Sequence, residues 1–107
     1  MTFEEAERYI AEYEQLYFRG ESFSESFIRN DLELRKTRDR LSTMGSGRPT
    51  NELTRKKSVY YQWFNENLGG INRILDEATN RSWDTIIDRC ERCKEQANRL
   101  LNLVRDF

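Results

Sequence analysis

The sequence of 107 residues contains no histidine. This absence removes the most common general acid or base at neutral pH and the most common metal-binding side chain. It also excludes nucleophiles that histidine activates and every zinc site that uses histidine. We therefore expect a chain that is not an enzyme and that binds no metal and no cofactor.

Helix breakers, cysteines and long apolar runs are also scarce. One proline and five glycines leave few residues that interrupt helices, and two cysteines are too few for a disulfide framework. No apolar run approaches the roughly 18 residues that a membrane span needs, and no signal-peptide pattern follows Met1. These absences predict a cytoplasmic protein without a membrane segment.

Aromatic and charged residues are plentiful. Six Phe, five Tyr and two Trp offset a hydrophobic content of only 36%, and a disordered chain would be short of such residues. The length suits one domain with a modest core. We therefore expect a single folded domain over residues 1–107.

The spacing of hydrophobic residues predicts a first helix over residues 3–19. Thr2 and Glu5 have the spacing of a capping box. Gly20 is expected to end the helix, because glycine readily adopts the left-handed conformation. The apolar residues recur three or four apart, which places them on one face: Phe3, Ala6, Ile10, Tyr13 and Tyr17.

A second helix is predicted after a capping box that begins at Ser22, and a third over residues 52–68. The third helix is expected to be capped by Thr50 or Asn51 and to end at Gly69-Gly70. Between the two, residues 45–51 form a Gly/Pro loop that we expect to be flexible. The second helix is expected to bury six hydrophobic residues: Phe23, Phe27, Ile28, Leu34, Leu41 and Met44.

Residues 71–107 are helical by periodicity, either as one helix or as two. We favour a break at residues 80–83, capped by Ser82, because the apolar stripes on its two sides are out of phase. Nothing in the sequence indicates a pair of strands or an internal repeat. The predicted fold is therefore all-α, a four- or five-helix bundle with a mid-chain Gly/Pro loop.

The last helix carries a stripe of apolar residues that alternate four and three apart. Such a stripe predicts self-association, with a homodimer as the most common result when the stripe is not buried within one chain. Cys90 and Cys93 have the spacing of a redox pair, but no strand precedes them, so we favour two small buried hydrophobes. The residues expected to self-associate are Ile86, Cys90, Cys93, Ala97, Leu100 and Val104.

Charge is segregated along the chain. Residues 1–34 carry a net charge of −6 and residues 35–57 a net charge of +6, although the whole chain is nearly neutral at −1. The first interpretation, which we favour, is that the basic segment folds against the acidic first helix or stays solvated. The second is a surface for an acidic protein or for nucleic acid, since arginine outnumbers lysine and suits carboxylates and phosphates.

Two local features lie in or beside the basic segment. Gly47-Arg48-Pro49 resembles the core of AT-hooks, which implies an arginine placed in a DNA minor groove, although an ordinary turn is the interpretation that we favour. Tyr61 and Trp63 cannot both share the face of Tyr60 and Phe64, so we expect one of them to be exposed as a contact residue.

These patterns predict a non-enzymatic helical interaction module, such as an adaptor, an assembly factor or an inhibitor. The partner is expected to be another protein with acidic character. The alternative is a small DNA- or RNA-binding protein that uses residues 35–57. The candidate binding residues are Arg35, Lys36, Arg38, Arg40, Arg48, Arg55, Lys56, Lys57, Tyr61 and Trp63.

Overall fold

A computed structural model describes residues 1–46 and 48–107, except for the side chain of Ser46. The described residues form helices and no strand, so the prediction of an all-α bundle is confirmed. None of these helices is long and apolar enough to cross a membrane. The elements are α1 (Phe3–Glu14), a π-helical turn η1 (Gln15–Arg19), α2 (Glu25–Ser46), α3 (Glu52–Asn80) and α4 (Asp84–Asp106).

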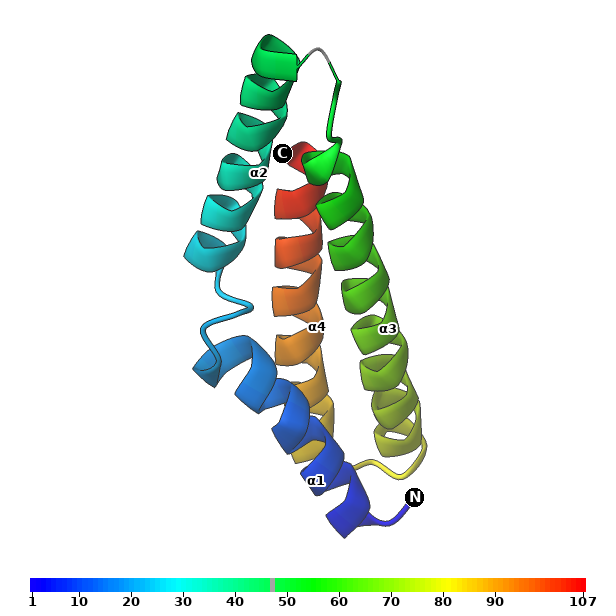
Figure 1. Ribbon diagram of the computed structural model, residues 1–107. Coiled ribbons are helices and arrows are strands. Elements are labelled where there is room, and N and C mark those ends of the chain that lie inside the picture. Colours follow the sequence, from blue (N-terminus) through cyan, green and yellow to red (C-terminus); the bar gives the residue numbers. More distant parts are fainter. Residues whose placement is uncertain (47) are drawn as a thin grey trace.

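The molecule is a rod built on a long hairpin of α3 and α4 (Figure 1). The helices α1 and α2 follow each other along one side of this hairpin, and each packs against both α3 and α4. Within the described residues, α1 and α2 make no contact with each other. Each level of the rod, which measures 58 × 20 × 20 Å, therefore contains three helices.

The core runs along the axis of the rod and is supplied by one face of each helix. Ile10 of α1, Ile28 of α2 and Phe64 of α3 are fully buried. The stripe of α4 is also fully buried against the other helices: Ile86, Cys90, Cys93, Ala97, Leu100 and Val104. This burial corrects the expectation that the stripe pairs two chains, because the same side chains already form the core of one chain.

The first helical segment matches its prediction in extent. Thr2 and Glu5 form the expected capping box, with Glu5 N–H donating to Thr2 Oγ1 and Thr2 N–H donating to Glu5 Oε1. The segment ends through the π turn η1, where Gly20 N–H donates to the carbonyl of Gln15 at 2.8 Å. Gly20 has φ −85° and is extended, so the expected left-handed glycine is wrong.

The orientation of α2 differs from the prediction. Ser24, and not Ser22, caps this helix, because its Oγ accepts a hydrogen bond from Phe27 N–H at 3.2 Å. The helix packs on α3 and α4 through Ile28 and Leu32, which are fully buried. Phe27, Leu34 and Leu41, which are seven residues apart, lie on the opposite face of the helix and therefore face solvent. Phe23 and Ile28 are buried as predicted, whereas four residues expected to be inward are exposed: Phe27, Leu34, Leu41 and Met44.

Gly69-Gly70 does not end α3, which continues to Asn80. Gly70 instead makes room for Tyr13 of α1, because a Cβ at this position would clash with the Tyr13 hydroxyl. The glycine therefore lets α1 approach α3 closely. The expected break before α4 is confirmed at residues 81–83, but Ser82 is left-handed (φ 57°) and does not cap α4.

The start of α3 is capped by a residue of α2. Asp39 Oδ1 accepts a hydrogen bond from Glu52 N–H at 2.7 Å, and Asp39 Oδ2 accepts one from Leu53 N–H at 3.0 Å. Asn51 occupies the N-cap position in a left-handed conformation without a capping side-chain bond, and the Thr50 hydroxyl donates to Asp39. Asn51 is thus at the predicted N-cap position, but neither Asn51 nor Thr50 supplies the capping side-chain hydrogen bond. Gly47 and the Ser46 side chain, which belong to the loop expected to be flexible, lie outside the described residues.

Candidate functional site

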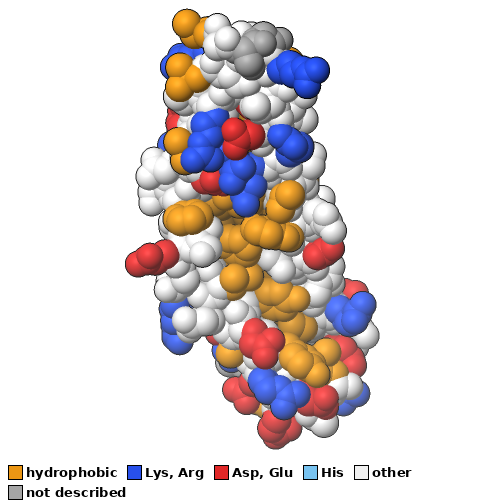
Figure 2. Space-filling model, viewed as in Figure 1, with side chains coloured by type: hydrophobic (Ala, Val, Ile, Leu, Met, Phe, Trp, Pro, Cys, Tyr) orange, Lys and Arg blue, Asp and Glu red, His pale blue; other side chains and the backbone are white. Residues whose placement is uncertain are grey.

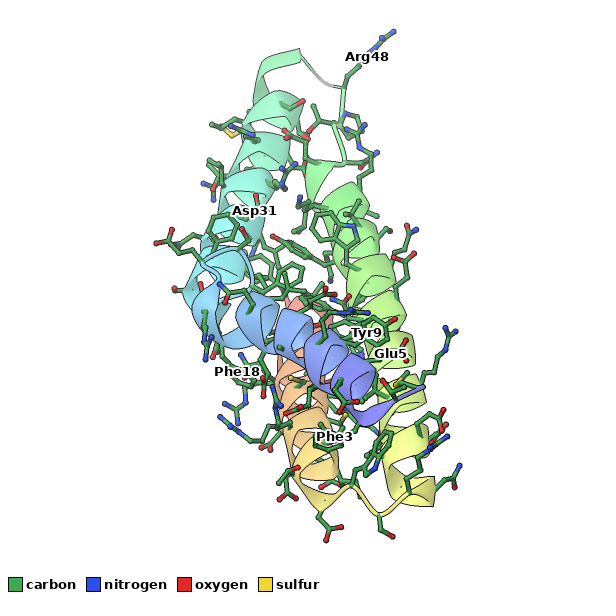
Figure 3. All side chains as sticks on the ribbon, turned by 90° about the horizontal axis from the view of Figure 1, so that it is seen from below. Phe3, Glu5, Tyr9, Phe18, Asp31 and Arg48 are labelled. Atoms are coloured by element: carbon green, nitrogen blue, oxygen red, sulfur yellow. The ribbon has the colours of Figure 1, made fainter. Side chains whose placement is uncertain are left out.

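The basic segment lies at the end of the rod that α1 does not reach. Arg48 lies at the α2–α3 junction and points away from the helices, whereas Glu5 and Tyr9 lie on α1 in the other half (Figure 3). Two acidic residues of α1 pair with α4 instead, because Arg89 Nε donates a hydrogen bond to Glu14 Oε2 at 2.9 Å and Arg89 Nη1 lies 3.9 Å from Glu7 Oε2. The expectation that the acidic first helix covers the basic segment is therefore wrong.

Part of the positive charge is balanced by nearer carboxylates. Arg35 Nε lies 3.1 Å from Asp31 Oδ1, and Arg35 Nη1 lies 3.7 Å from Glu52 Oε1. Arg38 Nη1 lies 3.5 Å from the same Glu52 oxygen. Asp31 also accepts a hydrogen bond from the Tyr60 hydroxyl at 2.8 Å. Arg35 and Arg38 thus belong to a network that joins α2 to α3.

Other basic side chains lie on aromatic rings or on the backbone. The Lys36 Nζ lies 5.7 Å from the centre of the Phe107 ring. The Lys56 Nζ lies 5.1 Å from the ring centres of both Tyr60 and Trp63. Arg55 donates to the backbone carbonyls of Thr50 and Asn51. Cation–π contacts of this kind leave the charge at the surface but hold the side chain in place.

Arg40 and Lys57 form no ion pair with any residue that the structure describes. Arg40 is exposed on α2 and Lys57 is partly buried on α3. Arg48 is exposed and has a contact of its own, and Gly47 of the Gly-Arg-Pro triplet lies outside the described residues. The segment therefore offers a few exposed arginines and not one continuous unpaired cluster.

The two candidate aromatic residues lie on opposite flanks of α3. Two residues along a helix are about 200° apart, so Tyr61 and Trp63 cannot contact one ligand from the same side. Trp63 is 41% exposed and contacts the rings of Phe23 and Tyr60, whereas Tyr61 is partly buried against the core. Trp63 is thus the exposed aromatic that the sequence predicts.

Two shallow apolar depressions lie in the groove where α1, η1 and the segment after η1 meet α3, and no pattern in the sequence predicts them. One depression of about 400 Å³ is lined by Tyr9, Tyr13 and Ile74, and another of about 350 Å³ by Leu16, Phe23 and Trp63, among others. Figure 2 shows hydrophobic side chains running down the middle of this face. The groove forms where segments that are far apart in the sequence pack together. The spacing of residues within one helix therefore does not predict it.

The outer face of α2 carries the four most exposed of the large hydrophobic side chains that the structure describes. Phe27 and Leu34 are each 48% exposed, Leu41 is 58% exposed and Met44 is 78% exposed. Asn30 and Thr37 fill the intervening positions, so that the spacing alternates three and four. We call these six residues the outer α2 stripe: Phe27, Asn30, Leu34, Thr37, Leu41 and Met44.

Charged residues flank the outer α2 stripe. Glu33 and Arg40 are exposed on one flank, and Asp31 and Arg38 lie on the other. Figure 2 shows hydrophobic side chains spaced along the edge of the molecule that α2 forms, together with Lys and Arg. The spacing of Phe27, Leu34 and Leu41 is visible in the sequence, but spacing alone does not show that this face is outward.

The two cysteines are structural. Both are fully buried and form no disulfide. Burial raises the pKa of the Cys90 thiol to about 11 and the pKa of the Cys93 thiol to about 12. Both thiols are therefore protonated at neutral pH and are poor nucleophiles.

No protein-family model, curated protein or solved structure matches this chain. Its function must therefore be argued from its own surface. Three surfaces qualify: the outer α2 stripe, the groove beside Trp63 and the basic end of the rod.

Proposed function

We propose that this chain is a non-enzymatic helical interaction module, such as an adaptor, an assembly factor or an inhibitor. It binds another polypeptide through the outer α2 stripe and the arginines beside it. One observation carries the proposal: four large hydrophobic side chains are exposed at heptad spacing on a helix whose opposite face is already packed. A row of this kind suits the apolar face of a second helix.

The energetics favour covering this face. Moving a large apolar side chain from water to an interface contributes roughly 1.5–3 kcal/mol when the side chain is fully buried. Leu34, Leu41 and Met44 already lie on a formed helix, so little backbone ordering opposes binding. Arg38 and Arg40 beside the stripe favour a partner with acidic residues at its rim.

Nucleic-acid binding is the second candidate. It is supported by the net charge of +6 in residues 35–57 and by the exposed Arg40, Arg48 and Arg55. The exposed ring of Trp63 lies beside Lys56, whose Nζ is 5.1 Å from the ring centre, and suits base stacking. This candidate is weaker because Arg35 and Arg38 are already paired with carboxylates.

The proposal is tested by comparing the wild-type chain with Leu34→Ser/Leu41→Ser as bait in a cell extract. Bound polypeptides are identified, purified and titrated against both baits. The double variant should lose binding at least tenfold, because both side chains are exposed and their removal leaves the core intact. Phe18→Ser removes an exposed aromatic outside α2 and serves as the matched control, which should retain binding.

The same proteins are then titrated with a labelled single-stranded oligonucleotide at several salt concentrations. Binding that weakens steeply with salt and is lost in Arg40→Gln/Arg55→Gln would support the nucleic-acid candidate. Equal polypeptide binding by the wild type and the Leu34→Ser/Leu41→Ser variant would contradict the proposal.

A further inference from the structure

We infer that the polypeptide covering the outer α2 stripe is a second copy of this chain, docked antiparallel to the first. This inference rests on the proposed function, since it names the partner of the same surface. It differs from the dimer expected from the sequence, which used the buried stripe of α4. Three observations carry it: the heptad spacing, the exposure of the stripe and the charge pattern along α2.

The outer face of α2 is free to receive a helix of the same length. α2 has 22 residues, which corresponds to about 33 Å and three heptads. Its contacts with the rest of the chain are made to α3 and α4, and it makes none with the described residues of α1. In Figure 1 one long side of α2 faces away from the hairpin. A second α2 can therefore lie along this side without displacing another element.

An antiparallel pair with a two-fold axis near residues 35 and 36 matches the stripe to itself. In such a pair the first and fourth heptad positions of one helix meet the fourth and first positions of the other. Phe27 then lies beside the partner's Met44, and Leu34 beside the partner's Thr37. All six residues of the stripe then contact the partner helix, and each contact occurs twice because of the two-fold symmetry.

The charges beside the stripe favour the antiparallel arrangement. Glu33 and Arg40 are seven residues apart on the same flank, and neither forms an ion pair with a described residue. In the antiparallel register Glu33 lies beside the partner's Arg40, and the same contact recurs across the axis. A parallel pair would place Glu33 beside the partner's Arg38, but it would leave Arg40 without an acidic neighbour and bring the two arginine-rich ends together.

The other flank is compatible with the same register. It places Asp31 near the partner's Arg38, so opposite charges meet there as well. Within its own chain Asp31 contacts Arg35, and Arg38 contacts Glu52, so these groups add less than Glu33 and Arg40 do. α2 therefore matches a second α2 that runs in the opposite direction, both in the spacing of its apolar residues and in its charges. An unrelated partner would not require this self-complementarity, which favours a second copy.

The first test measures molecular mass by sedimentation equilibrium at roughly 1–200 µM, a range suited to modest affinity. Asn30 and Thr37 interrupt the apolar stripe, so the dimer should be reversible. The mass should rise from 12.9 kDa towards twice this value as concentration increases. Leu34→Ser should remain monomeric, whereas the control Phe18→Ser should associate like the wild type, with helical circular dichroism unchanged in both.

The second test reverses the flanking charges. Glu33→Arg and Arg40→Glu should each weaken the dimer about tenfold, because each creates two like-charge contacts per dimer. The double variant Glu33→Arg/Arg40→Glu should restore wild-type association, since both contacts again join opposite charges. In a parallel pair Glu33 would instead lie beside the partner's Arg38, so failure of the double variant to recover would overturn the antiparallel arrangement.

The two proposals fail in different ways. A chain that stays monomeric throughout this range, or a dimer that Leu34→Ser leaves intact, overturns the second-copy inference. If the chain is monomeric but Leu34→Ser/Leu41→Ser still loses a captured polypeptide, the proposed function stands without the dimer. If these substitutions change neither the mass nor the capture, both proposals are wrong.

Discussion

Gly70 and Tyr13 show how one residue sets the distance between two helices. The Tyr13 hydroxyl occupies the position where a side chain at Gly70 would begin, whereas a Cβ on Gly69 would meet nothing within 4 Å. Both glycines lie inside α3 and are adjacent in sequence. Comparing an alanine substitution at each glycine therefore separates the effect of helix propensity on stability from the effect of packing against Tyr13.

We predict that Gly69→Ala raises the free energy of unfolding by about 0.5–1 kcal/mol, because alanine is the better helix former. Gly70→Ala should give a smaller gain or a loss, since Tyr13 must move away from its added Cβ. Urea denaturation measures both effects. In a Tyr13→Ala background the two substitutions should have equal effects, and equal effects in the wild-type background would contradict the close contact.

Within the candidate site, the exposure of some residues could be predicted from the sequence, whereas the partners of the charged residues could not. Tyr60 and Phe64 define the buried face of α3, and the sequence therefore predicts that one of the two aromatic residues beside that face is exposed. It does not show that this residue is Trp63. The pairing of Arg35 with Glu52 joins residues of two helices, so no local pattern indicates it. The sequence locates the basic segment, but it does not show which of its charges are already paired.

At the level of helices, the junction of α2 and α3 depends on a carboxylate. Hydrogen bonds from the Thr50 hydroxyl and from the backbone N–H groups of Leu53 and Glu52 lower the pKa of Asp39 below its ordinary value. A carboxyl group whose pKa is lowered in the folded state stabilises the fold above its unfolded-state pKa. This contribution is lost as the pH falls through the lower folded-state pKa.

We predict that Asp39→Ala destabilises the fold at pH 7 and that the difference from the wild type shrinks as the pH falls below about 4. Urea denaturation of both proteins between pH 7 and pH 2 measures this difference. Asp39→Asn is the control, because its amide oxygen still accepts one hydrogen bond but does not titrate over this range. A difference that does not change with pH would rule out the carboxylate as the cap.

At the level of the molecule, α1 and α2 stabilise separate halves of the α3–α4 hairpin. Ile10 of α1 and Ile28 of α2 are both fully buried, but their helices do not contact each other. Helices that pack independently on a common scaffold can open independently. The two halves of the rod should therefore be partly separate in stability.

We predict that Ile10→Ala, which should cost about 2–5 kcal/mol, accelerates amide hydrogen exchange in α1 more than in α2. Ile28→Ala is the matched substitution and should have the opposite pattern. Exchange followed by mass spectrometry of peptides measures both. Equal acceleration of α1 and α2 in each variant would show one cooperative unit.

Interactions within a few residues could be predicted from the amino-acid sequence. The Thr2–Glu5 capping box, the break at residues 81–83 and the apolar stripe of α4 all depend on neighbours along one chain segment. Packing between helices settled the rest. It turned Phe27, Leu34, Leu41 and Met44 of α2 outward, placed Tyr13 against Gly70 and placed Asp39 at the start of α3. Each of these outcomes depends on a contact between residues far apart in the chain, and periodicity within one helix does not encode such contacts.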